Sequence, residues 1–193
     1  MGSITGMYQT SDIRKGLKVE FDGEPYICVD FQFVKPGKGN AFTRTKFKSM
    51  VTGRVLDKTL KSGEVLQRAN MDERTMTYLY SDGSSYTFMD VENYEQIELQ
   101  ADVMGDAVKW LTENVEVQVL LHNDRPISIE LPNFVELAIV RCEPGVKGDT
   151  ATGATKPATL PSGATINVPL FVNESDILKI DTRTGEYAGR VRN

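Results

Sequence analysis

The stretch KVEFDGEPYICVDFQFV, residues 18–34, decides the fold, because apolar and polar residues alternate on both sides of Asp22-Gly23. Alternation with a period of two is typical of strands that bury one face, and Asp-Gly is a strong signal for a tight hairpin turn. The pattern recurs in residues 41–51, in residues 76–90 around Asp82-Gly83 and in residues 115–131 around Asn123-Asp124. Short strands broken by frequent turns predict a mainly β protein made of small barrels.

Residues 104–114 carry the clearest helix signal, with apolar residues at helical spacing and Asp106 in a position to cap the start. Trp110 lies off the apolar stripe, and we expect it to pack in a core or at its rim. In the last third, strand patterns fall in residues 133–143, 165–172, 177–185 and 186–191. Residues 144–164, rich in Gly, Thr and Pro, predict a long loop.

The chain has 193 residues, of which 40% are hydrophobic and 25% charged, as expected of an ordinary folded protein. The absence of a long apolar run and of a signal-peptide pattern predicts a cytoplasmic protein without a membrane partner. Cys28 and Cys142 lie far apart inside apolar runs, so we expect free, buried thiols. The single histidine, His122, has no nearby cysteine and no local partner, which predicts a structural or surface residue rather than a metal ligand or a general base.

Charge is distributed unevenly along the chain. Residues 1–69 contain 12 Lys and Arg against 7 Asp and Glu, whereas residues 70–132 contain 3 against 13. Phe31 to Leu56 includes no acidic residue, although several cations fall there: Lys35, Lys38, Arg44, Lys46, Lys48 and Arg54. A cationic stretch of this kind is typical of a surface that meets nucleic-acid phosphates, and a solvated cationic face is the alternative.

Within this stretch, KPGKGNA, residues 35–41, places Lys38 between two glycines at the end of a predicted hairpin. The spacing of a Walker A loop is absent, and no acid-base pair or activated nucleophile lies near the lysine. An exposed lysine is a weak nucleophile at neutral pH. The loop therefore predicts a binding element rather than a catalytic one.

Five segments together resemble bacterial elongation factor P: FVKPGKGNAF, GDAVKWL, PNFVELAIV, KPATLPSGATINVPLFV and IDTRTGEYAGRV. Their order and spacing extend the resemblance over residues 7–193. Ser175 departs from the family motif, which has glycine at this position, and the departure affects a turn in the last domain.

The resemblance implies three small barrels in an L shape: an SH3-like (KOW-like) domain over residues 7–69 and OB-fold domains over residues 70–132 and 133–193. Residues 1–6 are left out, because MGSITG resembles an expression remnant. The resemblance also implies a monomeric translation factor that is not itself an enzyme. Members of the family bind the 70S ribosome between the peptidyl and exit sites, position peptidyl-tRNA and stimulate peptide-bond formation at consecutive prolines.

The resemblance assigns roles to particular residues. In the family a modifying enzyme extends the loop lysine, usually with a β-lysyl group, so Lys38 is the expected modification site and no other cofactor is implied. Pro36, Gly37 and Gly39 are expected to keep the loop slim and stiff. The expected RNA contacts are Lys35, Arg44, Lys46 and Lys48 on the hairpin, Tyr187 and Arg190 toward peptidyl-site tRNA, and Gly148, Asp149 and Thr150 toward the exit-site mRNA codon.

Two alternatives remain open from the sequence. A general single-stranded RNA-binding protein would also use OB barrels, and aromatic residues interleaved with cations on one barrel face would favour it. The paralogue that resembles elongation factor P would differ chiefly in the loop around Lys38, and the intact PGKG favours the factor itself.

Overall fold

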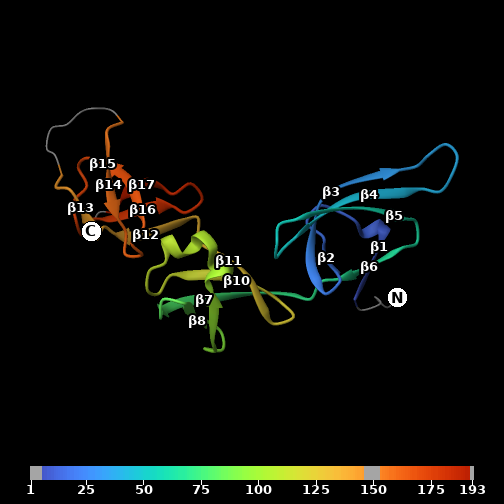
Figure 1. The fold of residues 1–193 in the computed structure, drawn as a ribbon, viewed down its shortest axis with the longest axis horizontal. Coiled ribbons are helices and arrows are strands. Elements are labelled where there is room, and N and C mark those ends of the chain that lie inside the picture. Colours follow the sequence, from blue (N-terminus) through green and yellow to red (C-terminus); the bar gives the residue numbers. More distant parts are fainter. Residues whose placement is uncertain (1–5, 146–152, 192–193) are drawn as a thin grey trace. The chain divides into compact units, whose positions relative to one another are not determined.

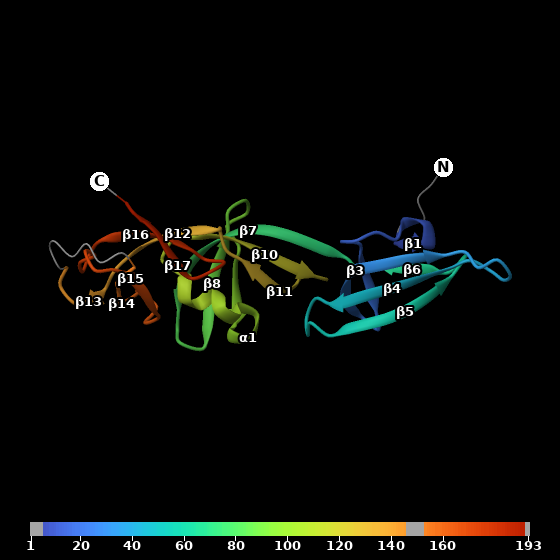
Figure 2. The ribbon, with the colours of Figure 1, turned by 90° about the horizontal axis from the view of Figure 1, so that it is seen from above.

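The structure is a computed structural model that describes residues 6–145 and 153–191 (Figure 1). The chain forms two compact units: unit 1 contains residues 1–72 and 121–127, and unit 2 contains residues 73–120 and 128–193. Strands make up most of both units, and helices are short (Figure 2). This architecture confirms the predicted mainly β fold class.

Unit 1 is organised around a six-stranded antiparallel sheet with the order β1-β6-β2-β3-β4-β5. Its strands are β1 (Met7–Gln9), β2 (Lys18–Phe21), β3 (Glu24–Val34), β4 (Phe42–Ser49), β5 (Val55–Lys61) and β6 (Val65–Arg68), and a short 3-10 helix (Thr10–Asp12) follows β1. Asp22 and Gly23 have φ angles of 52° and 78°. They form the tight β2–β3 turn that the sequence predicts.

Strands β3 and β4 extend well beyond β2, because β3 has 11 residues and β2 only four, while β5 pairs with β4 from Lys48 up to Phe42 beside the loop (Figure 1). Thr43, Thr45 and Phe47 of β4 are buried, whereas Arg44 and Lys46 between them are exposed. The predicted division of β4 into an inner and an outer face is therefore confirmed. A buried apolar cluster lies at the base of the hairpin: Ile13, Leu17, Val19, Cys28, Phe47, Leu60 and Leu66.

Residues 121–127, also part of unit 1, form a second tight turn. Asn123 and Asp124 have φ angles of 48° and 64°, as the predicted hairpin turn requires. His122 is buried, and its Nε2 lies 3.5 Å from Oε2 of Glu20 on β2. The Asn123 amide donates a hydrogen bond of 3.1 Å to the Asn70 carbonyl. The histidine is thus a packed structural residue, as expected.

The second sheet has five strands in the order β11-β10-β7-β8-β9. Its strands are β7 (Met71–Ser81), β8 (Ser85–Asp90), β9 (Gln96–Gln100), β10 (Glu116–His122) and β11 (Arg125–Glu130). The predicted turn at Asp82-Gly83 joins β7 to β8. The Asp82 carboxylate accepts hydrogen bonds from the amides of Ser84 and Ser85, and these donors lower the pKa of Asp82 to about 2.

The predicted helix over residues 104–114 is only partly correct. The helical segment consists of α1 (Ala101–Met104) and a 3-10 helix (Gly105–Trp110). Gly105 has a φ of 51° and a ψ of −135°, which no helix adopts, so the segment changes direction there. Asp106 makes no capping hydrogen bond and pairs instead with Lys109, at 3.4 Å. The expected cap is therefore wrong.

The last part of unit 2 consists of two three-stranded sheets, β12-β16-β17 and β13-β14-β15. The strands are β12 (Phe134–Ala138), β13 (Arg141–Cys142), β14 (Thr155–Thr159), β15 (Thr165–Pro169), β16 (Ile177–Asp181) and β17 (Glu186–Arg190). The chain passes between the sheets at a corner, because the Ile139 amide bonds to Asp176 and the Val140 amide to Thr159. Strand β14 lies inside the stretch that the sequence predicts as a loop, so the predicted loop is too long.

Trp110 joins the 3-10 helix to the apolar core of this last part. Its side chain is 8% exposed and packs in a cluster with buried residues of both small sheets, among them Val135 and Ile180 of one and Ile166 of the other. A Cβ atom on Gly185 would lie 3.4 Å from the indole, so the glycine lets the turn before β17 approach the ring. The expected core position of Trp110 is confirmed.

Cys28 and Cys142 are both free. Cys28 is buried as expected, and burial raises the pKa of its thiol, although the hydrogen bond to the Asp30 carbonyl opposes this effect. Cys142 is only partly buried, and its Sγ donates to the Val172 carbonyl. In the part of the chain that the structure describes, no helix has the length and apolar character needed to span a bilayer.

Candidate nucleic-acid interface

The loop between β3 and β4 carries Lys38 at its tip. Lys38 is exposed, and among residues 6–145 and 153–191 the structure gives its side chain no hydrogen bond and no ion pair. Lys35, just after β3, is also exposed. The hairpin therefore presents an unpaired amine away from the packed core of unit 1, as the isolated position of Lys38 in the sequence suggests.

The glycines on either side of Lys38 differ. Gly39 has a φ of 110°, a conformation that L side chains rarely adopt, and its absent Cβ would lie 3.8 Å from Cγ of Pro36. Gly37 lies in open space with no such φ angle. The fold of this loop therefore requires glycine at 39, and it does not require glycine at 37.

Strand β4 presents Arg44, Lys46 and Lys48 on its outer face, all three exposed. The register places Lys46 between Asp30 of β3 and Asp57 of β5. Its Nζ lies 3.1 Å from Oδ1 of Asp57, so this lysine already has a partner. Sequence reasoning missed that partner, because both aspartates lie just outside the acid-free stretch and only strand pairing brings them beside it.

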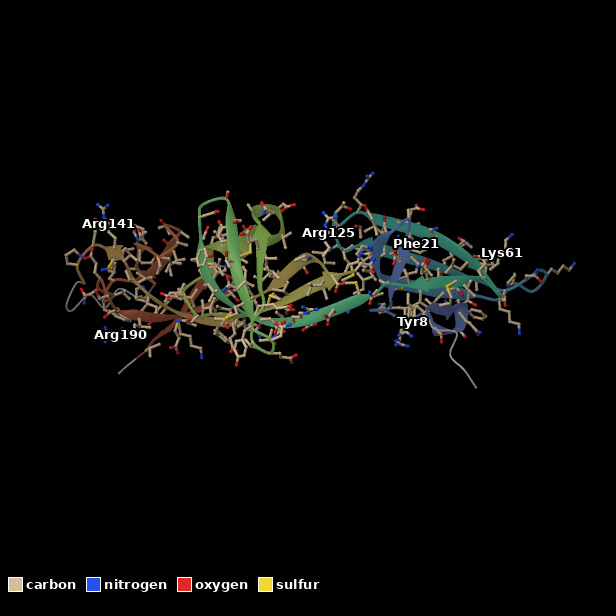
Figure 3. The ribbon with its side chains drawn as sticks, turned by 90° about the horizontal axis from the view of Figure 1, so that it is seen from below. Tyr8, Phe21, Lys61, Arg125, Arg141 and Arg190 are labelled. Atoms are coloured by element: carbon tan, nitrogen blue, oxygen red, sulfur yellow. The ribbon has the colours of Figure 1, made fainter. Side chains whose placement is uncertain are left out.

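Arg44 has different surroundings. It lies opposite Gln32 and Thr59, and its guanidinium stands 5.6 Å from the centre of the Phe42 ring. Lys61, at the end of β5 beside Phe42, adds a further cation near the loop (Figure 3). Within the described residues no carboxylate pairs with Arg44 or Lys48. Among the described residues, Arg44, Lys48 and Lys61 are therefore the cations of the outer face without a carboxylate partner.

Tyr187 and Arg190 lie together at the end of β17. Strict alternation would place residues three apart on opposite faces of a strand. The β16–β17 register shifts between Lys179 and Ile180, so that Ile180 pairs with Tyr187 and Leu178 with Arg190. Because Ile180 and Leu178 are both buried, this bulge brings Tyr187 and Arg190 onto one face.

Phe171 completes this second site, and sequence reasoning missed it because it lies in an apolar run. The ring is 47% exposed. The Tyr187 ring meets it edge-on, with centroids 6.4 Å apart, and the Arg190 guanidinium stands 5.4 Å from its centre. Its place in that run was the one available signal, because Phe171 comes two residues after Pro169, the last residue of β15.

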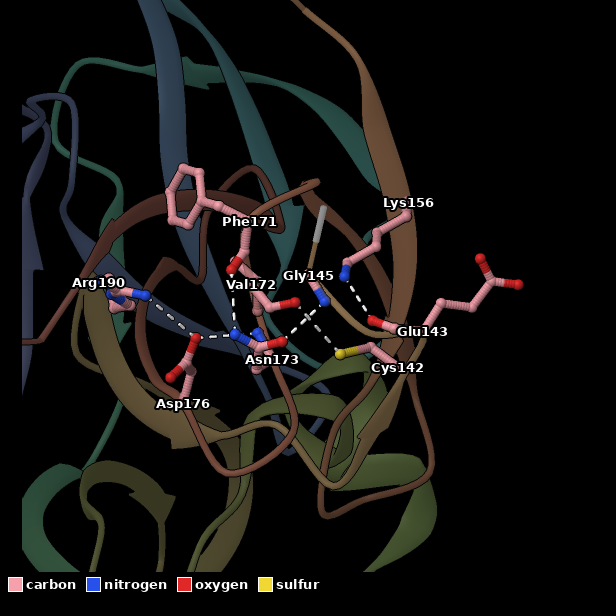
Figure 4. A network of polar contacts seen from close by, with 9 residues as sticks. All are labelled: Cys142, Glu143, Gly145, Lys156, Phe171, Val172, Asn173, Asp176 and Arg190. Carbon is pink, nitrogen blue, oxygen red and sulfur yellow. Dashed lines mark hydrogen bonds and ion pairs between the residues drawn. The ribbon is translucent and has the colours of Figure 1, made fainter. Parts of the chain in front are cut away.

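A polar network holds Arg190 in place (Figure 4). Its Nη1 lies 3.4 Å from Oδ2 of Asp176, and the same oxygen accepts a hydrogen bond of 2.9 Å from the backbone amide of Asn173. The Asn173 side chain in turn accepts the Gly145 amide at 2.7 Å. A Cβ on Gly145 would come within 2.8 Å of Asn173 and of the Phe171 carbonyl, so this close approach requires glycine.

Gly148, Asp149 and Thr150 lie outside the described residues, so their predicted contact with the mRNA codon stays a prediction. The strand end before them is firmly held. Lys156 is 6% exposed, and its ammonium donates to the Glu143 carbonyl (Figure 4). Within the described residues no carboxylate pairs with Lys156, and the carbonyl contact stabilises its buried charge.

An open groove of about 840 Å³ lies beside Tyr187 in unit 2. Its lining mixes both signs of charge, with Lys109 and Arg183 against Asp106 and Glu186. Arg183 forms a two-point ion pair with Asp181, which lowers the pKa of that carboxyl to about 2. In the described part of the chain, no group of three or more metal-ligating side chains is present.

Solved structures share the fold over about two thirds of the chain. A solved structure titled "Eukaryotic translation initiation factor 5A from Methanococcus jannaschii" matches with a TM-score of 0.56 at 22% identity, covering 65% of this chain and 92% of that one. A second, an initiation factor 5A family protein from Naegleria fowleri, matches with a TM-score of 0.53. At this identity the likeness establishes the fold.

Sequence comparison establishes the family. Residues 9–66 match the model described as Elongation factor P (EF-P) KOW-like domain, residues 71–129 the Elongation factor P (EF-P) OB domain, and residues 135–190 Elongation factor P, C-terminal. A curated "Elongation factor P" from Pelotomaculum thermopropionicum is 54% identical, covering 96% of this chain and all of its own length. One from Bdellovibrio bacteriovorus is 50% identical over 96% of this chain and 98% of that protein. The chain belongs to the elongation factor P family of translation factors.

Proposed function

We propose that the protein binds the 70S ribosome between the peptidyl and exit sites and helps peptide bonds form at consecutive prolines. In this proposal it acts in the cytoplasm and positions peptidyl-tRNA through Lys38, which a separate enzyme extends with a β-lysyl-type group. Bond formation itself remains the chemistry of the ribosome, so the protein contributes positioning and charge and is not an enzyme.

The isolation of Lys38 is the observation that carries the proposal. The Lys38 side chain lies at the tip of a long hairpin and has no partner in the described part of the chain. Next to it, Gly37 has a backbone conformation that does not require glycine. A modifying enzyme needs an accessible amine, and a narrow RNA-lined space admits only a slim loop. An amine free of internal contacts and flanked by glycines meets both requirements.

Extension of this lysine places a cation further from the backbone than any encoded side chain. Proline is a conformationally restricted and poor reactant in peptide-bond formation. A cation held against the phosphates and sugars of the tRNA acceptor end restricts that end to geometries in which attack occurs, and such restriction lowers the entropic part of a barrier.

The remaining predicted contacts divide between the two units. Arg44 and Lys48 on β4, together with Lys35 near the tip, offer charge to phosphates. Lys46 contributes less, because Asp57 neutralises it. Tyr187 and Arg190, gathered about Phe171, combine stacking and phosphate-binding groups of the kind that recognise RNA.

Translation of a reporter with consecutive prolines in a reconstituted system tests the proposal. The wild-type protein, purified from its own source, is expected to relieve the pause, and Lys38→Ala is expected to abolish relief while its thermal unfolding stays unchanged. A reporter without prolines provides the control. Full relief of the pause by Lys38→Ala would show that Lys38 is not required for the activity.

A further inference from the structure

Phe31 and Phe33 are exposed aromatic side chains on β3, immediately before the loop that carries Lys38. The Phe31 side chain is 40% exposed and that of Phe33 is 64% exposed, which makes Phe33 the most exposed phenylalanine of the described residues. Exposing two large apolar rings is unfavourable for a protein that leaves them in water. Their position at the loop suggests that a partner covers them.

The two rings share one face of the hairpin, because they are two residues apart on the strand after its bulge at Val29. Phe31 lies opposite Thr45, which lies opposite Lys58 on β5. This face is the continuation of the inner face of β4 and is distinct from the outer face of Arg44 and Lys48. We call Phe31 and Phe33 the aromatic platform.

The other exposed phenylalanines of the described residues already have cations over their rings. Lys179 stands 4.6 Å from the centre of the Phe134 ring, and Arg190 stands 5.4 Å from that of Phe171. Among the residues that the structure describes, no cation and no other aromatic ring stands over Phe31 or Phe33. Their ring faces are therefore available to a flat, external group.

Charge around the platform favours RNA over an apolar protein surface. Lys35 follows Phe33 at the same alternation, and Nζ of Lys58, at the far side of the same row, stands 4.3 Å from the centre of the Phe21 ring. Phe31 to Leu56 contains no acidic residue, and the flanking Asp30 and Asp57 lie on the outer face, where they pair with Lys15 and Lys46. Aromatic rings interleaved with cations are the usual platform for single-stranded nucleic acid, in which bases are free to stack.

The position relative to Lys38 selects one RNA. Lys38 lies five positions after Phe33, a span of at most about 17 Å in an extended chain. An RNA strand that meets the extended lysine at one end therefore runs past the platform within a few nucleotides. A tRNA ends in unpaired nucleotides, and these supply bases that are free of a complementary strand.

We propose that Phe31 and Phe33 form a stacking platform for unpaired bases at the 3′ end of peptidyl-site tRNA. This inference rests on the proposed function and names the part of the tRNA that the hairpin recognises. Side chains two residues apart on a strand are separated by about 6.7 Å, roughly twice the spacing of stacked bases. Neighbouring bases that stack on the two rings must therefore separate from one another, which favours an unpaired strand over a duplex.

Affinity for two kinds of ribosome tests the platform. The double variant Phe31→Leu, Phe33→Leu keeps the apolar volume and removes the flat faces, and Phe31→Tyr, Phe33→Tyr restores them. On ribosomes with peptidyl-site tRNA, the leucine variant is expected to bind about tenfold or more weakly than the wild type, and the tyrosine variant like the wild type. On ribosomes without tRNA, all three are expected to bind equally.

Equal affinity of the leucine variant and the wild type on tRNA-loaded ribosomes would overturn the inference. An equal loss on both kinds of ribosome would overturn it too, because the partner would then be ribosomal. The proposed function is tested separately, by measuring whether the wild-type protein relieves the pause at consecutive prolines. A wild type that relieves pausing while the leucine variant binds normally defeats only the platform.

A photoreactive p-benzoylphenylalanine at position 33 gives an independent readout. Irradiation of the complex with tRNA-loaded ribosomes is expected to crosslink the protein to the unpaired 3′ nucleotides of the tRNA. The same group at Val65, whose side chain is 53% exposed on β6, is the matched control and should not give this product. Crosslinks from position 33 to ribosomal RNA or protein alone would contradict the assignment.

Discussion

Gly37 and Gly39 flank Lys38 symmetrically in the sequence, yet their backbones are not equivalent. Gly39 has the positive φ that favours glycine, whereas Gly37 has open space around it and no such angle. The structure of the isolated chain therefore explains one glycine and leaves the other without an internal reason. Under the proposed function, Gly37 keeps the tip narrow for a space outside the protein.

Alanine substitutions separate these two roles. Gly37→Ala is expected to leave the free energy of unfolding unchanged or slightly raised, by up to about 1 kcal/mol, because the backbone can accept a side chain there. Gly39→Ala is expected to lower it by about 1–2 kcal/mol, because of its φ of 110°. Chemical denaturation measures both. In the proline-reporter assay, Gly37→Ala should lose activity despite its intact fold, and full activity would mean that the tip has room to spare.

Ser175 shows the opposite case, a non-glycine residue at a positive φ. Its φ is 70°, in the left-handed region, and its amide donates to the Ile139 carbonyl. The glycine that the family resemblance leads one to expect at this position fits this geometry without strain. The departure noted in the sequence is thus a local conformational cost in the turn before β16.

Ser175→Gly is expected to raise the free energy of unfolding by about 0.5–1 kcal/mol, since relief of left-handed strain exceeds the added entropy of the unfolded chain. Ser62→Gly is the matched control, because Ser62 precedes a glycine in a turn but has no positive φ. That variant should be destabilised or unchanged. A Ser175→Gly variant that is no more stable than the wild type would show that the turn does not strain Ser175.

The β3–β4 hairpin shows why charge must be counted across strands as well as along them. The acid-free stretch correctly identified an outward row of cations on β4. Strand pairing then placed Asp57 against Lys46, so the three cations of the row do not have equal access to phosphate. The hairpin therefore predicts a graded response rather than three equal contributions.

Single substitutions of this row to glutamine test that gradation through the salt dependence of ribosome binding. Arg44→Gln and Lys48→Gln are each expected to weaken binding and to reduce the slope of log affinity against log salt by about one ion. Lys46→Gln should change the slope least, because Asp57 already neutralises that charge. Identical slopes for wild type and all three variants would exclude phosphate contacts on this face.

Hairpins with Asp-Gly or Asn-Asp turns were predictable from local sequence, because alternation and turn chemistry act over a few residues. The helix near Trp110 was less so, since Gly105 breaks it by a backbone choice that apolar spacing does not reveal. Strand β14 was hidden by Pro157, which disfavours strands, although its partner Asn167 on β15 pairs with it nonetheless. The conformation of Gly105 thus overrode apolar spacing in the helix, and pairing with β15 overrode local preference in β14.

Across the whole molecule, alternation and turn signals predicted the mainly β class, and the resemblance predicted the family. The structure confirms the first and the comparisons confirm the second. The division at residues 69 and 132 stays a prediction, as do the roles of the individual site residues. Features that depend on strand register could not be predicted from the sequence. These are the bulge that brings Tyr187 and Arg190 onto one face, the contact of Phe171 with both of them, and the exposure of Phe31 and Phe33.

The central claim is that Lys38 is an attachment point whose encoded side chain is only part of the working group. Mass spectrometry of the intact protein purified from its own source, followed by peptide mapping, tests it most directly. The account predicts an added mass that maps to Lys38 alone, and greater relief of proline pausing by this material than by unmodified protein. An unmodified Lys38 in fully active protein would contradict the claim.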